Sequence, residues 1–99
     1  LYRGSMVIKH NTYFDGNVQS LGFESKGQPV SVGVMAAGEY QFGTDAAERM
    51  LVISGELNVL LPGSDNWQRF GPGEEFNVPA HSAFDLQIPE TSSYACFYG

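Results

Sequence analysis

Short apolar runs separated by turn residues recur along the whole chain. The clearest pair is Glu48–Gly55 and Glu56–Leu61, which meet at a Ser-Gly corner and are followed by a Pro-Gly turn. Runs rich in β-branched residues between such breaks are typical of β-strands. Alternation places Glu48, Met50, Val52 and Ser54 on one face of the first strand. If that face is the interior, the chain carries a carboxyl group inside its fold.

The same pattern predicts about ten short strands and no helix longer than a single turn. The turn-forming segments between them include a loop at Glu24–Pro29 and a corner at Thr44–Ala47, the only place where we expect a turn of helix. We predict an all-β fold, a single small β-barrel with a pocket in its mouth. After a mixed segment at Val7–Gly16, the expected strands are Val18–Phe23, Val30–Met35, Glu39–Gly43, Glu48–Gly55, Glu56–Leu61, Trp67–Phe70, Glu75–Val78, Ala83–Ile88 and Tyr94–Tyr98.

The length of 99 residues fits one domain with one hydrophobic core. Residues 1–5 precede Met6 and look like a remnant of cloning, so the domain is expected to span residues 6–99. Twelve glycines and five prolines are spread evenly along the chain. Such even punctuation fits many short strands better than long helices.

Charge and cysteine content narrow the partners and the compartment. A formal net charge of −6 argues against nucleic acid, whose phosphates an acidic protein repels. No apolar run approaches the roughly 18 residues of a membrane span, so we expect no membrane partner. Cys96 is the single cysteine, which rules out an internal disulfide and fits the reducing cytoplasm.

Two segments resemble the two sequence motifs of the cupin family of jelly-roll barrels. In the first, Gly38 leads to Glu48, and six residues separate Glu48 from Gly55, as in the cupin pattern. The two histidines of that motif would fall among positions 42 to 46, none of which is histidine. The glycine and carboxylate positions of the motif are therefore present without its imidazoles.

The second cupin motif is also incomplete. Gly73 and Pro79 are correctly spaced, but His81 stands where the pattern has glycine, and Phe84 stands where it has a metal-binding histidine. A metal site needs a cluster of imidazole and carboxylate ligands, and only Glu48 remains of the usual set. We predict that the protein binds no metal.

A further series of segments runs in order through residues 11–98: Tyr13–Gly16, Ser31–Met35, Gly38–Phe42, Val52–Pro62, Trp67, Phe76–Pro79 and Tyr94–Tyr98. Together they resemble the pyrimidine/purine nucleoside phosphorylases, a family of small metal-free cupins. The resemblance implies phosphorolysis, in which inorganic phosphate as co-substrate displaces the base of a purine or pyrimidine nucleoside and leaves ribose 1-phosphate. It also implies a homodimer and no further cofactor.

Phosphorolysis requires particular side chains. The reaction passes through a positively charged, oxocarbenium-like sugar while negative charge grows on the base, so the site needs a carboxylate or hydroxyls near the ribose and flat walls for the base. Because side chains alternate between the two faces of a strand, the motif positions predict which residues face the interior, and several of these have suitable side chains. They are Tyr40, Phe42, Thr44, Glu48, Met50, Phe76, Phe84, Tyr94, Cys96 and Tyr98.

Two residues, Glu48 from this list and His81 outside it, are the candidates for catalysis. Glu48 is the candidate for binding the ribose hydroxyls and stabilising the positive sugar; the alternative is that it caps the corner Thr44–Ala47 or pairs with Arg49. His81 stands at a turn near the barrel mouth, where an imidazole could protonate the leaving base. The alternative for His81 is a structural or solvated role.

The remaining inward residues are candidates for substrate binding. Aromatic faces stack on any base without reading its edges, which would explain the acceptance of both base classes. Tyrosine hydroxyls could also reach phosphate or base, whereas the alternative for all these rings is core packing. The predicted substrate-binding residues are Tyr40, Phe42, Thr44, Met50, Phe76, Phe84, Tyr94 and Tyr98.

The groups that bind phosphate remain open at this stage. Parity turns Arg49 outward, and Arg69 lies on another strand near a turn. Backbone amides at the corners, or Lys26 reaching across a dimer, could serve instead. Hydroxyl candidates are Thr44, Ser54 and Ser82.

A dimer is also a physical expectation, because the edge strands of a small barrel tend to pair with another chain. Tyr13, Phe14 and Trp67 are the candidates for that contact. Two other functions stay open: a non-catalytic cupin that binds a small sugar or nucleoside, and a metal-dependent isomerase or dioxygenase with an unusual ligand set. The second has Glu48 and His81 in its favour and too few other ligands.

Overall fold

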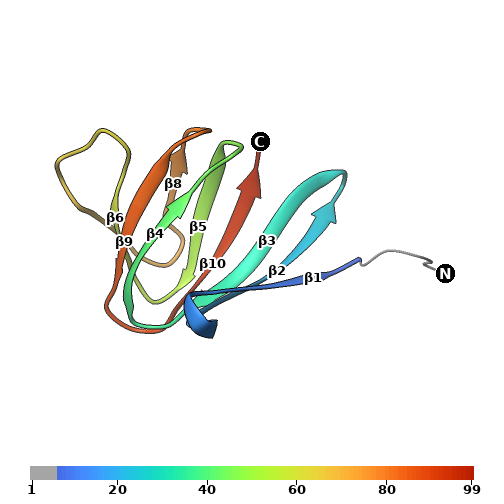
Figure 1. The fold of residues 1–99 in the computed structure, drawn as a ribbon, viewed down its shortest axis with the longest axis horizontal. Helices are drawn as coiled ribbons and strands as arrows, with labels where there is room; N and C mark the ends of the chain where they lie inside the picture. The colour runs from blue at the N-terminus through green and yellow to red at the C-terminus, as the bar shows by residue number, and fades with distance from the viewer. Residues whose placement is uncertain (1–6) are drawn as a thin grey trace.

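A computed structural model describes residues 7–99 as ten β-strands and one short 3-10 helix (Figure 1). The segment 1–5 that we interpreted as a cloning remnant lies outside the described residues. The strands are β1 (Lys9–Tyr13), β2 (Val18–Ser25), β3 (Gln28–Met35), β4 (Gly38–Gly43), β5 (Glu48–Ser54), β6 (Leu57–Leu60), β7 (Gln68–Phe70), β8 (Glu75–Val78), β9 (Ala83–Ile88) and β10 (Ser92–Tyr98), and the helix η1 spans Phe14–Gly16.

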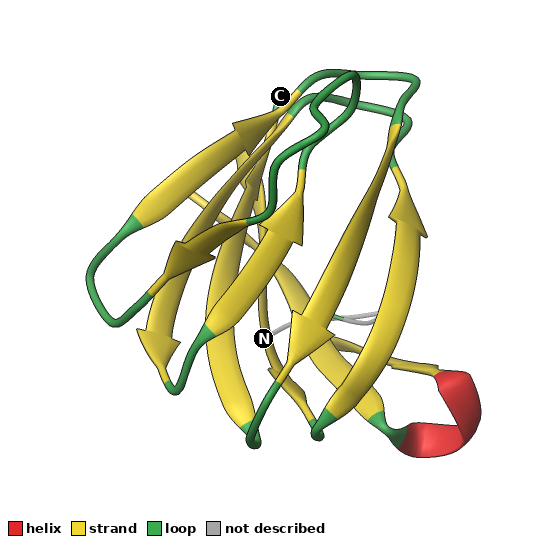
Figure 2. Cartoon of the chain, turned by 90° about the vertical axis from the view of Figure 1, so that its left-hand side faces the viewer, coloured by secondary structure: helices red, strands yellow, loops and turns green. Residues whose placement is uncertain are grey.

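The strands form two antiparallel sheets that face each other (Figure 2). The larger sheet has the order β1-β2-β3-β10-β5-β8, and the smaller has the order β4-β9-β6-β7. The all-β prediction is confirmed. The strands form two separate hydrogen-bonded sheets, and not one continuous barrel wall. Because the smaller sheet has two strands fewer, β1 and the β2–β3 hairpin extend past it (Figure 1).

Two local predictions were wrong. The expected loop at Glu24–Pro29 is a tight hairpin, because Lys26 and Gly27 adopt the positive φ angles of 52° and 78° that a two-residue turn requires. The helical turn lies at Phe14–Gly16 and not at the corner Thr44–Ala47. None of the helices in residues 7–99 is long and apolar enough to cross a membrane.

The core lies between the two sheets and follows the alternation of the strands. On β8 and β9, for example, every second side chain is buried. Four partly buried side chains, Phe42, Leu61, Phe70 and Tyr98, pack against this core. Its buried members are Val18, Met35, Tyr40, Met50, Val52, Leu57, Val59, Phe76, Val78, Phe84, Leu86, Ile88, Tyr94 and Cys96.

A β-bulge interrupts the alternation near the end of β5. Val52 pairs with Tyr94 and Ser54 pairs with Ser93, so Ile53 is an extra residue with no partner on β10. The alternation that holds from Glu48 to Val52 therefore does not reach Ser54. Ser54 is exposed and hydrogen-bonds the hydroxyl of Ser93, which corrects the prediction that it faces inward.

Gly33 allows the ring of Tyr94 to lie flat across β3. The two residues are directly opposite each other, and a Cβ atom on Gly33 would lie 2.5 Å from the Tyr94 hydroxyl oxygen and 2.6 Å from Cζ. We predict that Gly33→Ala lowers the free energy of unfolding by about 1–3 kcal/mol, because the ring must leave its place. Urea denaturation measures this change.

The matched control is Gly22→Ala in the neighbouring strand β2. The nearest atom to a Cβ on Gly22 is Asn11 Nδ2 at 3.7 Å, which is ordinary contact. Because glycine is unfavourable inside a strand, this variant should be neutral or slightly more stable than the wild type. Equal losses of stability in the two variants would contradict the prediction.

Candidate functional site

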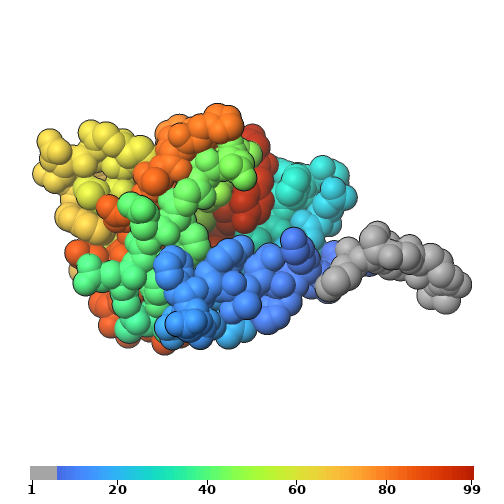
Figure 3. Space-filling view, viewed as in Figure 1, coloured from blue at the N-terminus to red at the C-terminus, as the bar shows by residue number. Residues whose placement is uncertain are grey.

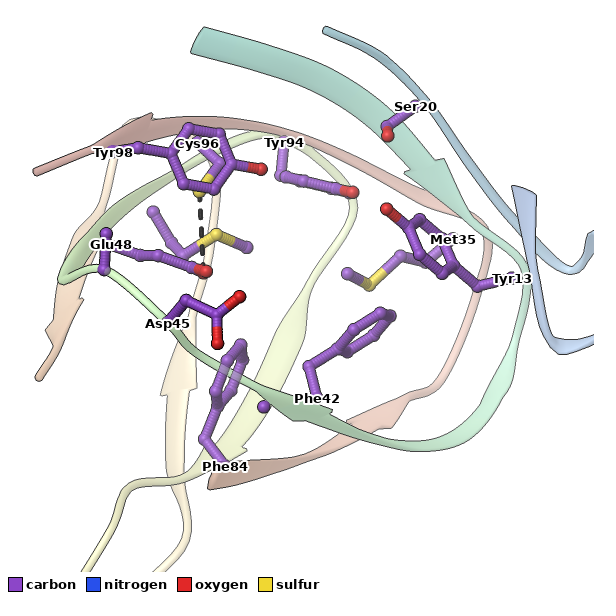
Figure 4. Close-up of a pocket in the computed structure, with 13 residues that line it drawn as sticks. Tyr13, Ser20, Met35, Phe42, Asp45, Glu48, Phe84, Tyr94, Cys96 and Tyr98 are labelled. Atoms are coloured by element: carbon purple, nitrogen blue, oxygen red, sulfur yellow. Dashed lines mark hydrogen bonds between the residues drawn. The ribbon is translucent and has the colours of Figure 1, made fainter. Parts of the chain in front are cut away.

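A cavity of about 310 Å³ opens between the sheets at the end where β4 gives way to β5. This volume lies at the lower end of the roughly 300–1,000 Å³ of small-molecule sites. β1, β2, β3, β5 and β10 of the larger sheet supply one wall, and β4 and β9 supply the other (Figure 4). The lining residues are Tyr13, Ser20, Met35, Phe42, Gly43, Asp45, Ala46, Glu48, Met50, Phe84, Tyr94, Cys96 and Tyr98.

Glu48 is the first residue of β5 and directs its carboxylate into this cavity (Figure 4). Its strand lies between β10 and β8, where Glu48 pairs with Tyr98 and Val78. Partial burial raises the pKa of Glu48, and a hydrogen bond from Cys96 Sγ to Oε1 at 3.6 Å offsets part of that rise. The carboxylate is thus poorly solvated and has only a weak donor.

A second carboxylate, Asp45, lies beside Glu48 (Figure 4). It comes from the corner between β4 and β5, and the sequence analysis missed it. No Lys, Arg or His side chain among residues 7–99 lines the cavity. The site therefore has two acidic groups without a cation of its own, which favours a neutral ligand or one that becomes positively charged.

Three protonated donors stand along β10, the strand that crosses the cavity wall. Burial, followed by the nearby charge of Glu48, raises the pKa of Cys96 to about 12. Burial is also the main cause of the raised pKa of Tyr94 and of Tyr98. The Tyr98 hydroxyl shares a 2.8 Å hydrogen bond with Ser31. At neutral pH all three groups keep their protons, so the thiol is not a nucleophile here.

The wall opposite β10 is aromatic. Phe42 on β4 and Phe84 on β9 lie 6.2 Å apart between centroids with an interplanar angle of 30°. Tyr13 meets Phe42 edge to face at 5.7 Å. Phe14, next to it, packs on Tyr40 and Phe42, so the two rings cover the gap between β1 and β4. Flat faces of this kind suit a planar ligand.

Six of the ten residues proposed from the sequence come together in the cavity, and four do not. Tyr40 is buried in the core and donates its hydroxyl to the Ala36 carbonyl at 2.8 Å. Phe76 packs on Phe70 in the core, with centroids 4.8 Å apart. The six that line the cavity are Phe42, Glu48, Met50, Phe84, Tyr94 and Tyr98.

The other two residues outside the cavity lie at the corner between β8 and β9, to which His81 belongs and which Thr44 contacts from the β4–β5 corner. Thr44 Oγ1 donates to the Pro79 carbonyl at 2.7 Å and accepts from the Ser82 amide at 3.0 Å, so its hydroxyl is used in holding that corner. His81 is exposed there with a φ of 54°. Neither side chain is in contact with the cavity, and a catalytic role for His81 stays a prediction.

The donor groups do not fit a metal ion. In residues 7–99, no three His, Cys, Asp or Glu side chains gather as metal ligands would. The two arginines that the sequence analysis set aside as phosphate ligands form ion pairs outside the cavity. Arg49 pairs with Glu75 at 2.9 Å on the outer face, and Arg69 Nε lies 3.5 Å from Glu56.

A family model and a similar protein sequence both match this chain and have the same description. A family model described as pyrimidine/purine nucleoside phosphorylase matches residues 8–98. A Pseudomonas entomophila protein of that name is 53% identical over 92 residues, which cover 93% of this chain and 98% of the relative. A protein of unknown function from Vibrio parahaemolyticus has a solved structure with a TM-score of 0.91 at 50% identity, over 93% of this chain and 98% of that one.

The cupin fold is confirmed by a more distant structure. An RmlC-like cupin from Shewanella frigidimarina superposes with a TM-score of 0.71 at 16% identity, over 94% of this chain and 93% of that one. At this identity the likeness concerns the fold alone. It shows that the two facing sheets are the jelly-roll arrangement of a cupin.

The raised pKa of Glu48 has a consequence for stability. The folded protein disfavours the charged carboxylate, so Glu48 costs stability above its folded pKa and costs nothing below its unfolded pKa. We predict that Glu48→Gln is more stable than the wild type at pH 7, by less than about 1 kcal/mol because solvent still reaches the group. The gain should shrink at pH 4, and urea denaturation at both pH values measures it.

Glu39→Gln is the control for removing one negative charge from an acidic chain. Glu39 is exposed on β4 and does not line the cavity. Its replacement should change stability less between the two pH values than Glu48→Gln does. A Glu48→Gln variant that is less stable at pH 7 than at pH 4, relative to the wild type, would contradict the burial argument.

Proposed function

Because the chain belongs to the pyrimidine/purine nucleoside phosphorylase family, we propose that its cavity binds a nucleoside and that the protein cleaves it with inorganic phosphate. The observation that carries the proposal is the family match over residues 8–98, together with a cavity that has two carboxylates and aromatic walls. The products are the free base and ribose 1-phosphate. No cofactor is needed for this chemistry.

The base lies against Phe42 and Phe84. These rings offer flat apolar faces and no polar edge that could select one base. Stacking on such faces contributes roughly 1–3 kcal/mol per base and tolerates every base. The proposal therefore includes both purine and pyrimidine nucleosides, uridine among them.

The ribose lies beside Glu48 and Asp45. As the bond from C1′ to the base breaks, positive charge develops on the sugar, and a carboxylate held nearby stabilises that charge. Glu48 is suited to this because partial desolvation strengthens its interaction with a developing cation. Two carboxylates also repel a nucleotide, so the substrate is the uncharged nucleoside.

The assembly and compartment belong to the same proposal. Four large apolar side chains on the outer face of the larger sheet are exposed, which is typical of an interface. They are Leu21 (48%), Val32 (39%), Val34 (48%) and Ile53 (48%). We propose that a second copy of the chain covers this face, in a homodimer that works in the cytoplasm. Tyr13, Phe14 and Trp67, the residues first considered for this contact, are exposed as well but lie outside this apolar face.

The activity is tested by following base release from uridine and adenosine with and without phosphate, by chromatography. We expect release only with phosphate, with ribose 1-phosphate formed in equal amount. Glu48→Gln should lower kcat/KM by at least about tenfold, which corresponds to about 1.4 kcal/mol of lost transition-state stabilisation. Glu39→Gln, outside the cavity, should keep the wild-type rate.

Two outcomes would overturn this function. Nucleoside binding without base release would indicate the non-catalytic ligand-binding cupin. Base release that does not depend on phosphate would indicate a hydrolase. Metal analysis after purification without chelator addresses the third candidate, because stoichiometric metal would favour an isomerase or dioxygenase.

The dimer proposal has its own test. Val34→Lys places a charge within the exposed apolar face, so we expect this variant to be monomeric where the wild type is a dimer by light scattering coupled to gel filtration. Trp67→Lys is the control, because Trp67 is 43% exposed immediately before β7 and does not line this face. A monomeric wild type, or a dimeric Val34→Lys, would exclude the proposed interface.

A further inference from the structure

A second recess adjoins the cavity where the larger sheet extends past the smaller one. It has a volume of about 640 Å³ and lies over the inner face of β1, β2 and β3. Figure 3 shows the surface hollowed between β1 (blue), β4 (green) and the β2–β3 hairpin (cyan), with β10 (red) at the floor. Its polar lining includes Lys9, Asn11, Ser31 and Tyr98.

Strand register places these groups on the same face as the cavity. Lys9 pairs with Gly22, Gly22 with Ser31, and Ser31 with Cys96, so one row of residues crosses four strands from the recess to the cavity wall. Gly22 has no side chain, which leaves the floor between Lys9 and Ser31 open. Asn11 Nδ2 lies 3.7 Å from where a Gly22 Cβ would be.

Tyr98 connects the two spaces, because it lines both of them. Its hydroxyl lies 2.8 Å from Ser31 Oγ. When Ser31 donates that hydrogen bond, the Tyr98 proton is free to bind an anion in the recess. An anion held there would stand next to the ribose side of the cavity, beside Glu48.

Lys9 supplies the cation that the cavity lacks. The ion pairs among residues 7–99 are Arg49–Glu75 and Arg69–Glu56, so the Lys9 ammonium is not engaged with a described carboxylate. An ammonium, an amide and a phenol are donors that suit the oxygens of a phosphate dianion. Glu24 also lines the recess and would compete for Lys9.

We propose that inorganic phosphate, the co-substrate of the proposed function, binds in this recess with Lys9 as its counter-charge and Asn11 and Tyr98 as hydrogen-bond donors. From there a phosphate oxygen attacks C1′ of the ribose. The new O–C1′ bond forms as the C1′–N bond breaks. The electron pair of the C1′–N bond leaves with the base nitrogen. That nitrogen receives the proton of the hydrogen phosphate, so the charges balance.

Arg49 is the competing cation. It lies on the outer face, where its guanidinium bonds Glu75 at 2.9 Å and stands 4.1 Å from the centroid of the Phe97 ring. Phosphate bound there would be separated from the cavity by the thickness of the sheet. This difference in position allows a direct comparison of the two residues.

The test measures phosphate binding and turnover separately. Phosphate binding is followed by calorimetry at constant ionic strength, and KM for phosphate and for uridine by base release. We expect Lys9→Gln to weaken phosphate binding and raise KM for phosphate at least tenfold, with KM for uridine changed less than twofold. Glu24→Gln should tighten phosphate binding, because it removes the competing carboxylate.

Lys26→Gln and Arg49→Gln are the matched controls. Each removes one positive charge, from the hairpin tip and from the outer face, and should leave both KM values unchanged. Loss of phosphate binding in Arg49→Gln but not in Lys9→Gln would overturn the proposal, as would unchanged phosphate binding in Lys9→Gln.

The experiments distinguish an error in the phosphate site from an error in the proposed function. If the wild type releases no base but binds phosphate in a Lys9-dependent way, the phosphorylase function fails and the anion site stands. If base release requires phosphate while Lys9→Gln behaves as the wild type in both measurements, the function stands and this site is wrong.

Discussion

The partial burial of one carboxylate determines most of what this structure can do. Glu48 begins a strand that lies between two others, so its backbone is fixed and its side chain must enter the space between the sheets. Its one side-chain donor is a thiol, a weak partner. A charge kept in such surroundings costs stability, and it interacts strongly with positive charge that appears beside it.

The unequal sheets then divide the interior into two environments. Where four strands face six, aromatic rings and two carboxylates surround a cavity that suits an uncharged, planar ligand. Where the larger sheet is uncovered, an ammonium and hydrogen-bond donors face solvent. Tyr98 on β10 lines both spaces, so one side chain lies between a site for a neutral molecule and one suited to an anion.

Alternation within strands allowed much of this to be predicted. Nine strand positions and the inward direction of Glu48 follow from local pattern, because the side-chain period of a strand is two residues. Asp45 was not found, since it lies in a corner where no period applies. Lys9 was not found either, because the face that β1 presents depends on its register with β2, a long-range pairing that no local pattern specifies.

Because of the bulge at Ile53, the number of residues in β5 determines which face each side chain occupies more than the identity of those residues does. Before the bulge every second residue, Glu48, Met50 and Val52, faces the interior, whereas Ile53 and Ser54 are both exposed. Deleting Ile53 would remove the bulge together with its local bend and added twist, so the chain would leave β5 for the Gly55 turn in a different direction. Over evolutionary time, therefore, this segment should accept exchanges of side chains readily and insertions or deletions hardly ever.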